Sequence, residues 1–260
     1  MLRCASSWVF FIFTAFLIGF LSTSAYAVPV NYGNLVGINV TYVQVTEDSG
    51  TDPTPLFGAP TLAGDTLNFD PVSFNSSSTG AGGVDVTDGT LTFMVDAKPN
   101  HVIEELAFSE AGDFTLAGFG DEGTFASVTA DLFINITEVD DISITPINFN
   151  TSMVFAPSAG NWDLLNDGPG PLVNGIWTGS VNVDLTQILI DNGVIFTEGV
   201  TLASVTLDNT LVTLSEDGTS SFIAKKDAQG LSVTAVVPEP STTLLLGLGL
   251  GLLSRARRRD

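Results

Sequence analysis

The sequence predicts an all-β protein: an antiparallel β-sandwich, jelly-roll-like, followed by a short C-terminal hydrophobic helix. Two observations lead to this fold class. Apolar residues alternate with small or polar residues over several long stretches, which is typical of strands with one buried face. About ten such stretches follow one another without long helical periodicity between them, which favours a sandwich over a parallel sheet covered by helices.

The clearest alternation covers residues 124–137. One face of that expected strand carries only apolar side chains: Ala126, Val128, Ala130, Leu132, Ile134 and Ile136. Shorter alternations in residues 36–42 and 177–185 repeat the pattern. Further strands are expected at residues 90–95, 102–108, 142–155, 201–207, 211–214, 220–224 and 231–236. Together these strands supply enough buried faces for a two-layered core.

Turn residues divide the expected strands. Asp88-Gly89 precedes one strand, and Asp208-Asn209 is predicted to form the tip of a hairpin. Residues 185–190 could form one short helical turn. Stretches rich in Gly, Pro, Ser and Thr predict surface loops at residues 49–60, 75–83 and 157–171. We expect one sandwich body over residues 28–236, the alternative being two domains that divide within residues 155–172.

The N-terminal segment predicts a signal peptide over residues 1–27. A positive charge at Arg3 precedes an apolar run at residues 8–21, and small residues at Ala25 and Ala27 suit the pockets of a signal peptidase. The run is shorter than the roughly 20 residues that a membrane-spanning helix needs. Export through the Sec translocon and cleavage after Ala27 are therefore expected.

The C-terminal segment, residues 237–260, reads as three consecutive blocks. The motif Val237, Pro238, Glu239 and Pro240 comes first, and residues 241–253 follow without a charge. The last block is basic and contains Arg255, Arg257, Arg258 and Arg259. Positive residues after an apolar segment stay on the cytoplasmic side of a membrane, so the body would be held outside the cell.

This order of blocks resembles the PEP-CTERM domain of Gram-negative bacteria. The resemblance implies a protein that an exosortase sorts in an exopolysaccharide or biofilm context, from a transient tether in the inner membrane to the cell surface or extracellular matrix. A helix over residues 240–254 would rise about 22 Å, short of a hydrocarbon core of roughly 30 Å. We therefore expect a temporary tether, with a permanent tail anchor as the alternative.

Composition narrows the class of protein further. The single cysteine, Cys4, lies in the predicted signal peptide, so the body has no disulfide. Residues 28–254 hold three lysines against 28 Asp and Glu (all but Asp260), which leaves a formal charge of −25. Such a charge argues against nucleic-acid binding, because phosphates need Lys and Arg contacts. It favours solubility or the attraction of divalent cations.

The sequence offers little catalytic chemistry, and we expect no enzyme. His101 is the one histidine and has no Gly-x-Ser-x-Gly motif to accompany it. Glu104 and Glu105 would point to opposite faces of a strand. The neighbouring Asp140 and Asp141 lie at an expected turn and are interpreted as solvated charges. A hydrolase that uses carboxylates alone is the weakest of the functions considered.

Two weaker hypotheses concern ligands. Calcium, which takes oxygen ligands from acidic loops, could bind at Asp163 and Asp167 or at Asp121 and Glu122. Trp162, which lies among turn residues, could stack on a sugar ring or fold back over the edge of the sandwich. The expected function is a structural or adhesive surface protein. The alternative is a carbohydrate-binding module that could depend on calcium.

Overall fold

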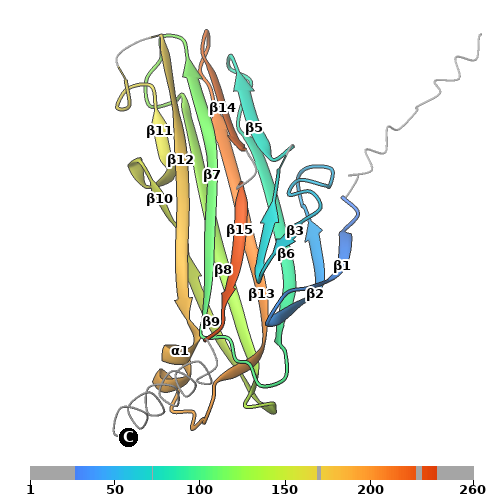
Figure 1. Ribbon diagram of the computed structural model, residues 1–260. Coiled ribbons are helices and arrows are strands. Elements are labelled where there is room, and N and C mark those ends of the chain that lie inside the picture. The colour runs from blue at the N-terminus through green and yellow to red at the C-terminus, as the bar shows by residue number, and fades with distance from the viewer. Residues whose placement is uncertain (1–26, 72, 169–170, 227–229, 239–260) are drawn as a thin grey trace, which may run out of the picture.

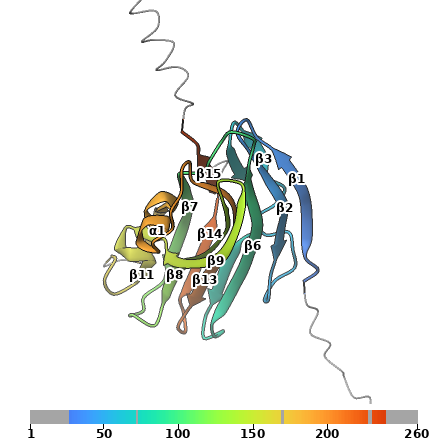
Figure 2. The same cartoon turned by 90° about the horizontal axis from the view of Figure 1, so that it is seen from below.

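The computed structural model describes residues 27–71, 73–168, 171–226 and 230–238, and these form two antiparallel sheets packed face to face (Figures 1 and 2). The first sheet has the order β1-β2-β6-β13-β8-β11, and β9 also pairs with β8. Its strands are β1 (Val30–Val36), β2 (Val40–Asp48), β6 (Asp85–Ala97), β13 (Val200–Leu214), β8 (Phe125–Val139), β11 (Asn161–Asp163) and β9 (Ile142–Ser152). The predicted all-β sandwich is confirmed.

The second sheet has the order β10-β12-β7-β15-β4-β3, and β14 lies between β7 and β5. Its strands are β10 (Val154–Ala156), β12 (Leu172–Asp184), β7 (Glu105–Ala117), β15 (Leu231–Val236), β4 (Thr66–Phe69), β3 (Thr61–Ala63), β14 (Ser220–Lys225) and β5 (Asn75–Thr79). The chain crosses between the sheets from β6 to β7 to β8, and again from β12 to β13 to β14. Jelly-roll sandwiches share this alternation.

The predicted alternation in β8 determines which of its side chains are buried in the core. All six apolar residues of the expected face are at most 2% exposed, and the same period buries the inward residues of β13 and β7. The inward side chains of both sheets form one hydrophobic cluster. A cluster of this size stabilises a body without disulfides, because each fully buried aliphatic or aromatic side chain contributes about 1.5–3 kcal/mol.

Several boundaries differ from the prediction. Asp208-Asn209 is no hairpin tip, since β13 runs through it, and Asp88-Gly89 lies inside β6. Residues 36–42 contain the turn between β1 and β2, and the expected loop at residues 75–83 begins with β5. Residues 142–155 divide between the two sheets, in β9 and β10. In each case pairing with neighbouring strands overrode a local turn or strand signal.

The helix α1 (Leu185–Asp191) confirms the predicted helical turn, and a 3₁₀ turn, η1 (Ser158–Gly160), precedes β11. The Asp184 side chain caps α1 by accepting a hydrogen bond from the Gln187 backbone N–H at 2.8 Å. Leu185, Ile188 and Leu189 are buried beneath it. The helix thus closes one end of the core, as Figure 1 shows.

The sandwich has two distinct ends. At the end that we call the base lie α1 and the turn between β8 and β9, and β15 ends there at Val236, opposite Glu105 (Figure 1). At the opposite end, the tip, Ala117 of β7 lies opposite both Leu172 and Ser220. The C-terminal segment therefore leaves the body from the base.

In the described part of the chain, no helix has the length and apolar character needed to cross a membrane. The C-terminal hydrophobic helix expected over residues 240–254 lies outside the described residues.

Candidate functional site

The predicted sorting motif begins where the described chain ends. Val237 and Pro238 follow β15 directly, whereas Glu239, Pro240 and the four arginines lie outside the described residues. Ala25 of the expected cleavage site lies outside them as well. The Val236 carbonyl accepts a hydrogen bond from the Glu104 N–H at 2.9 Å. This bond fixes the point from which the tail emerges.

Trp162 is not the exposed platform that was expected as a sugar-binding candidate. It is 2% exposed, and its ring stacks on Phe114 with 4.3 Å between the centroids and 13° between the planes. β11 pairs with β8 and so folds this loop back onto the core. The large apolar ring is therefore buried in the sandwich edge, and it offers no face to a ligand.

The first expected calcium loop holds itself together through its own backbone. The Asp167 Oδ2 atom accepts a hydrogen bond from the Asp163 N–H at 2.8 Å, and Asp163 Oδ1 accepts one from the Asn166 N–H at 2.7 Å. The two carboxylates therefore cap a turn. Across the described ranges, no three or more His, Cys, Asp or Glu side chains come together in a way that could hold a metal ion.

The second expected calcium loop is organised around a residue that the sequence did not single out. Glu216 Oε2 accepts hydrogen bonds from the Asp121 N–H at 2.8 Å and from the Thr124 hydroxyl at 3.0 Å. The Asp121 carboxylate accepts the Gly123 N–H at 2.8 Å. The neighbouring Glu122 is exposed, and within the described chain it belongs to no group of three or more acidic, His or Cys side chains that could hold a metal ion.

Asp140 lies partly exposed at the expected turn, and it also makes structural contacts that the sequence did not predict. Its carboxylate accepts backbone N–H bonds from Thr197 at 2.6 Å, Glu198 at 2.9 Å and Gly199 at 2.8 Å. Desolvation raises the pKa of Asp140, but the three N–H donors outweigh it, so the pKa is lowered overall. The carboxylate thus fastens the β8–β9 turn to the segment that enters β13.

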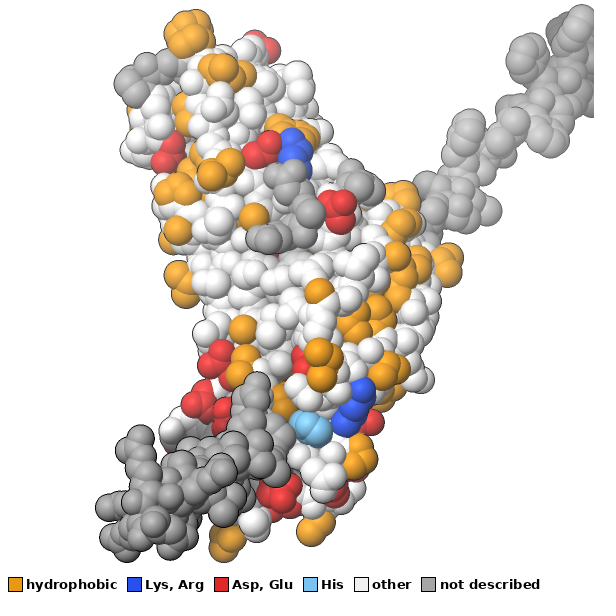
Figure 3. All heavy atoms as spheres, viewed as in Figure 1, with side chains coloured by type: hydrophobic (Ala, Val, Ile, Leu, Met, Phe, Trp, Pro, Cys, Tyr) orange, Lys and Arg blue, Asp and Glu red, His pale blue; other side chains and the backbone are white. Residues whose placement is uncertain are grey.

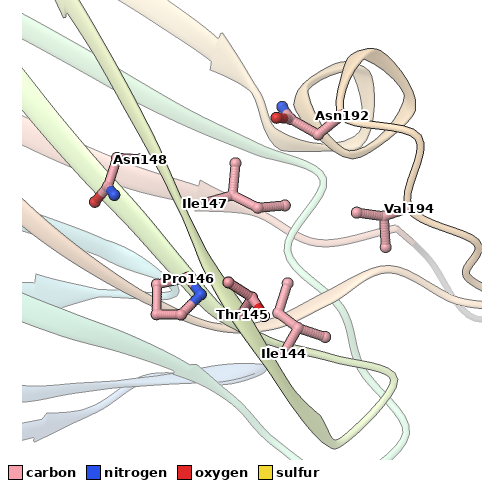
Figure 4. A pocket seen from close by; sticks show the side chains of 7 residues that line it. All are labelled: Ile144, Thr145, Pro146, Ile147, Asn148, Asn192 and Val194. Carbon is pink, nitrogen blue, oxygen red and sulfur yellow. The ribbon is translucent and has the colours of Figure 1, made fainter.

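A surface hollow of about 500 Å³ lies at the base, between β9 and the chain that follows α1 (Figure 4). Ile147 and Val194 extend toward one another across it, with Asn192 beside them. Its lining is Ile144, Thr145, Pro146, Ile147, Asn148, Asn192 and Val194. The lining contains neither an aromatic ring nor a charged group, so it has no stacking platform for a sugar.

The most unusual arrangement of polar groups lies inside the core. Lys225, at the end of β14, is 1% exposed, and its ammonium contacts Oε2 of Glu110 and Oδ1 of Asn209. Glu110 is 2% exposed on β7, and Asn209 is fully buried on β13. These three residues, which we call the buried triad, therefore join the two sheets across the core.

Two atoms of the buried triad have no hydrogen-bond partner among the described residues: Oε1 of Glu110 and Nδ2 of Asn209. Burial lowers the pKa of the Lys225 ammonium, against the opposing effect of the Glu110 carboxylate. Leaving a buried charge pair incompletely hydrogen-bonded is costly, because both ions lose their hydration. If the triad served packing alone, it would therefore lower the stability of the fold relative to apolar residues of the same size.

Two aromatic rings enclose the Lys225 ammonium, Phe74 directly before β5 and Trp177 on β12. The Phe74 ring centroid lies 5.2 Å from Nζ, and the Trp177 ring centroid lies 5.7 Å from it. Both rings occupy space that a glycine leaves free. A Cβ on Gly89 would lie 2.6 Å from Phe74, and a Cβ on Gly112 would lie 2.3 Å from Trp177. These strand glycines permit the enclosure.

Sequence reasoning missed the buried triad, although a signal existed. Glu110 occupies an inward position of β7, between Phe108 and Gly112, and Asn209 occupies an inward position of β13 between Leu207 and Leu211. A polar residue inside an apolar alternation indicates a buried polar contact. The Asn209 signal was instead interpreted as a turn.

The outer face of the sandwich is acidic. Asp208 lies opposite Asp131 across β13 and β8, and desolvation together with the charges of Asp88 and Asp131 raises the pKa of Asp208. On the face in Figure 3, acidic side chains gather toward the base. Because Lys225 is enclosed, it does not offset this surface charge.

A sandwich body followed by an apolar and basic tail defines a class of protein: an exported protein whose C-terminal segment directs its handling at the membrane. Residues 236–259 match the family model of the PEP-CTERM protein-sorting motif. The chain is therefore a PEP-CTERM domain-containing protein, and the predicted resemblance is confirmed. The motif indicates that the protein is exported, that an exosortase is its processing partner, and that it is sorted at the membrane to the cell surface.

Other comparisons contribute less. No curated protein matches the sequence. Among solved structures, TmCBM61 in complex with beta-1,4-galactotriose is 11% identical, with a TM-score of 0.19 over 66% of this chain and 70% of the other. The enzymatically active domain of tailspike protein 4 of bacteriophage CBA120 is 12% identical, with a TM-score of 0.21 over 76% of this chain and 19% of the other. Likenesses at these TM-scores carry no functional argument.

Proposed function

We propose that the sandwich body is a structural or adhesive component of the cell surface or of an exopolysaccharide matrix. The observation that carries this proposal is the position of the sorting tail, residues 236–259, which begins at the last residue of β15 at the base of the sandwich. While the tail holds the protein at the membrane, the base faces the membrane and the tip points outward. The folded body is then held outside the membrane until the exosortase processes the tail and the protein passes to the surface.

The chemistry of the body supports a role without catalysis. Its carboxylates cap turns and join loops, as Asp140, Asp163 and Glu216 do. At the tip, large apolar side chains are available for contact, with Phe119 84% exposed and Leu165 56% exposed. The alternative of a carbohydrate-binding module loses the residue on which it depended, because Trp162 is buried.

The proposal is tested by replacing Glu239 with Ala in the full chain and following the protein in its native envelope. The unchanged protein is expected at the surface or in the matrix without its arginine-rich end, as shown by mass spectrometry of the C-terminal peptide. Glu239→Ala is expected to remain in the membrane fraction with that end attached. Glu198→Ala, at an exposed glutamate outside the tail, is the matched control.

The matrix role needs a separate readout. A strain without the gene is expected to form weaker pellicles or attach less firmly, and the unchanged chain should restore attachment while Glu239→Ala should not. Equal attachment by all three strains would contradict the structural or adhesive role, and equal distribution of the two proteins would contradict sorting through the tail.

A further inference from the structure

The buried triad has the composition of a reaction centre as well as of a structural contact. It contains an amine (Lys225), an amide carbonyl carbon (Asn209 Cγ) and a carboxylate (Glu110), all enclosed in the core. An amine held against an amide in water-free surroundings can exchange for the amide nitrogen, provided that a proton acceptor is at hand. From this juxtaposition we infer that Lys225 and Asn209 become joined by an intramolecular isopeptide bond, with Glu110 as the group that moves the protons.

The positions of the atoms favour this reaction. Lys225 Nζ contacts Asn209 Oδ1, and the carbon under attack, Cγ, is bonded directly to that oxygen. Nζ also contacts Oε2 of Glu110, which is the acceptor for the proton that an ammonium must lose before its nitrogen can attack. Because the fold already holds the reactants together, the reaction avoids the entropy loss of a bimolecular encounter. Avoiding this loss raises the rate by many orders of magnitude.

Burial prepares the nucleophile. Phe74 and Trp177 exclude water from Nζ, and desolvation disfavours its charged form, so proton transfer to Glu110 is favoured over what it would be in water. The two unpartnered atoms are also accounted for. Nδ2 of Asn209 is the nitrogen that leaves, and Oε1 of Glu110 is free to pass a proton to it.

The atoms and charges balance without an oxidant or a co-reactant. The Nζ–Cγ bond forms, the Cγ–Nδ2 bond breaks, and Nδ2 leaves as ammonia. Of the three protons on the Lys225 ammonium, one remains on the new amide, one departs with the ammonia and one stays on Glu110. A buried ion pair is thereby replaced by a neutral amide and a neutral carboxylic acid, which removes the desolvation cost of two buried charges.

The isopeptide bond would crosslink the sandwich, which a disulfide within the body cannot do. The one cysteine of the chain is Cys4, which lies outside the sandwich strands, whereas an isopeptide bond needs no oxidising environment. It would join β13 of the first sheet to β14 of the second across the core. A covalent link between the two layers opposes their separation under load at the cell surface.

The test is a peptide map of the folded full chain after denaturation and cleavage at glutamates. Cleavage after Glu198 and Glu216 separates Asn209, in peptide 199–216, from Lys225, in the C-terminal peptide that begins at Asp217. The Glu239–Pro240 bond stays intact, because a proline follows the glutamate. We expect these two peptides as one branched species, lighter than their sum by one ammonia, about 17 Da. Recovery of both as separate peptides with their sequence masses would overturn the inference.

Variants identify the chemistry. Lys225→Arg keeps the positive charge without a comparable nucleophile, and Asn209→Ala removes the electrophile, so both should give separate peptides. Glu110→Gln keeps the size of the side chain but cannot accept the proton, and a folded Glu110→Gln protein should also give separate peptides. A branched species at the unchanged yield in this variant would refute the role of Glu110. Circular dichroism establishes that each variant is folded.

Two controls separate this bond from a neighbouring lysine and from a second source of ammonia. Lys226→Arg alters the neighbouring lysine, which is half-exposed and paired with Asp113 at 2.7 Å, and it should keep the branched species. Cyclisation at Asn192-Gly193 would also release ammonia, but that loss would appear in the linear peptide 139–198. A loss found there, with peptide 199–216 and the peptide that begins at Asp217 recovered separately, would overturn the inference. The unchanged chain alone decides the matter if a variant fails to fold.

Discussion

Gly89→Ala tests whether this glycine is a strand residue that makes room for the core, as the structure has it, or a turn residue, as its sequence context suggests. The glycine lies opposite Asn209 in the pairing of β6 with β13. A Cβ at this position would lie 2.6 Å from Cε2 of Phe74 and 3.2 Å from Cε2 of Phe57. Both rings are buried and pack edge to face, with their centroids 5.0 Å apart, so neither can move freely.

Overpacking of this kind costs about 1–3 kcal/mol. The loss of backbone freedom in the unfolded chain returns about 0.4–1 kcal/mol for a glycine-to-alanine change. The middle of each range gives a net destabilisation of about 1.3 kcal/mol, which lowers the melting temperature of a body of this size by about 3–5 °C. Thermal unfolding followed by circular dichroism measures this shift.

Gly50→Ala is the matched control for Gly89→Ala. Gly50 is exposed, and its added Cβ would meet one atom within 4 Å, the Asp88 Oδ2 atom at an ordinary contact distance of 3.8 Å. Its melting temperature should stay the same or rise slightly. If Gly89→Ala behaved like Gly50→Ala, the close approach of Phe74 to β6 would be refuted, and with it the enclosure of the buried triad.

Three further predictions concern the acidic groups and the sandwich edge. Asp208→Asn should stabilise the protein at neutral pH by about 0.2–1 kcal/mol, because it removes a partly desolvated charge and its repulsion from Asp88 and Asp131. The folded-state pKa of Asp208 is raised, so the benefit should fade as acidification protonates the carboxyl, and a pH-independent benefit in thermal unfolding would contradict this cause. Asp140→Ala should lower the free energy of unfolding by about 1 kcal/mol after allowance for solvent screening. Because the folded-state pKa of Asp140 is lowered, its contribution to stability is present above the ordinary value of 3.8 and is lost as the pH falls through the lowered pKa. An unchanged midpoint of urea unfolding at neutral pH would contradict a stabilising role of these hydrogen bonds. Trp162→Ala should cost about 3–5 kcal/mol through lost stacking on Phe114; a melting temperature equal to that of the unchanged protein would show instead that the ring is a surface group.

Long alternating patterns in the sequence predicted strands correctly, whereas short turn signals did not always predict turns. The alternation in residues 124–137 predicted both β8 and its buried face, because a strand on the core must place every second side chain inward. The prediction of β15 at residues 231–236 matched in both bounds. By contrast, Asp208-Asn209 was read as a turn because Asp and Asn usually form turns, whereas the neighbouring strands β6 and β8 hold it extended.

The candidate sites show the same division. Trp162 was considered for sugar stacking because it lies among turn residues, and its burial depends on Phe114, which is 48 residues earlier in the chain. The carboxylates of Asp163 and Asp121 looked like metal ligands, yet each accepts a nearby backbone N–H. Local composition shows which groups are present, but their partners depend on the path of the backbone.

By itself, the sequence determined the class of fold and the sorting tail. A sorting enzyme recognises a short, linear order of segments, and a half-buried strand must alternate apolar with polar residues, so both features can be recognised in short stretches of sequence. The signal peptide has the same kind of local pattern and stays a prediction. Only the tertiary structure decided that Lys225 lies against Glu110, 115 residues away, and against Asn209, 16 residues away. The physical reason is that three strands from two sheets place these side chains in one enclosed space, where water is excluded and an amine, an amide and a carboxylate have only one another as polar partners.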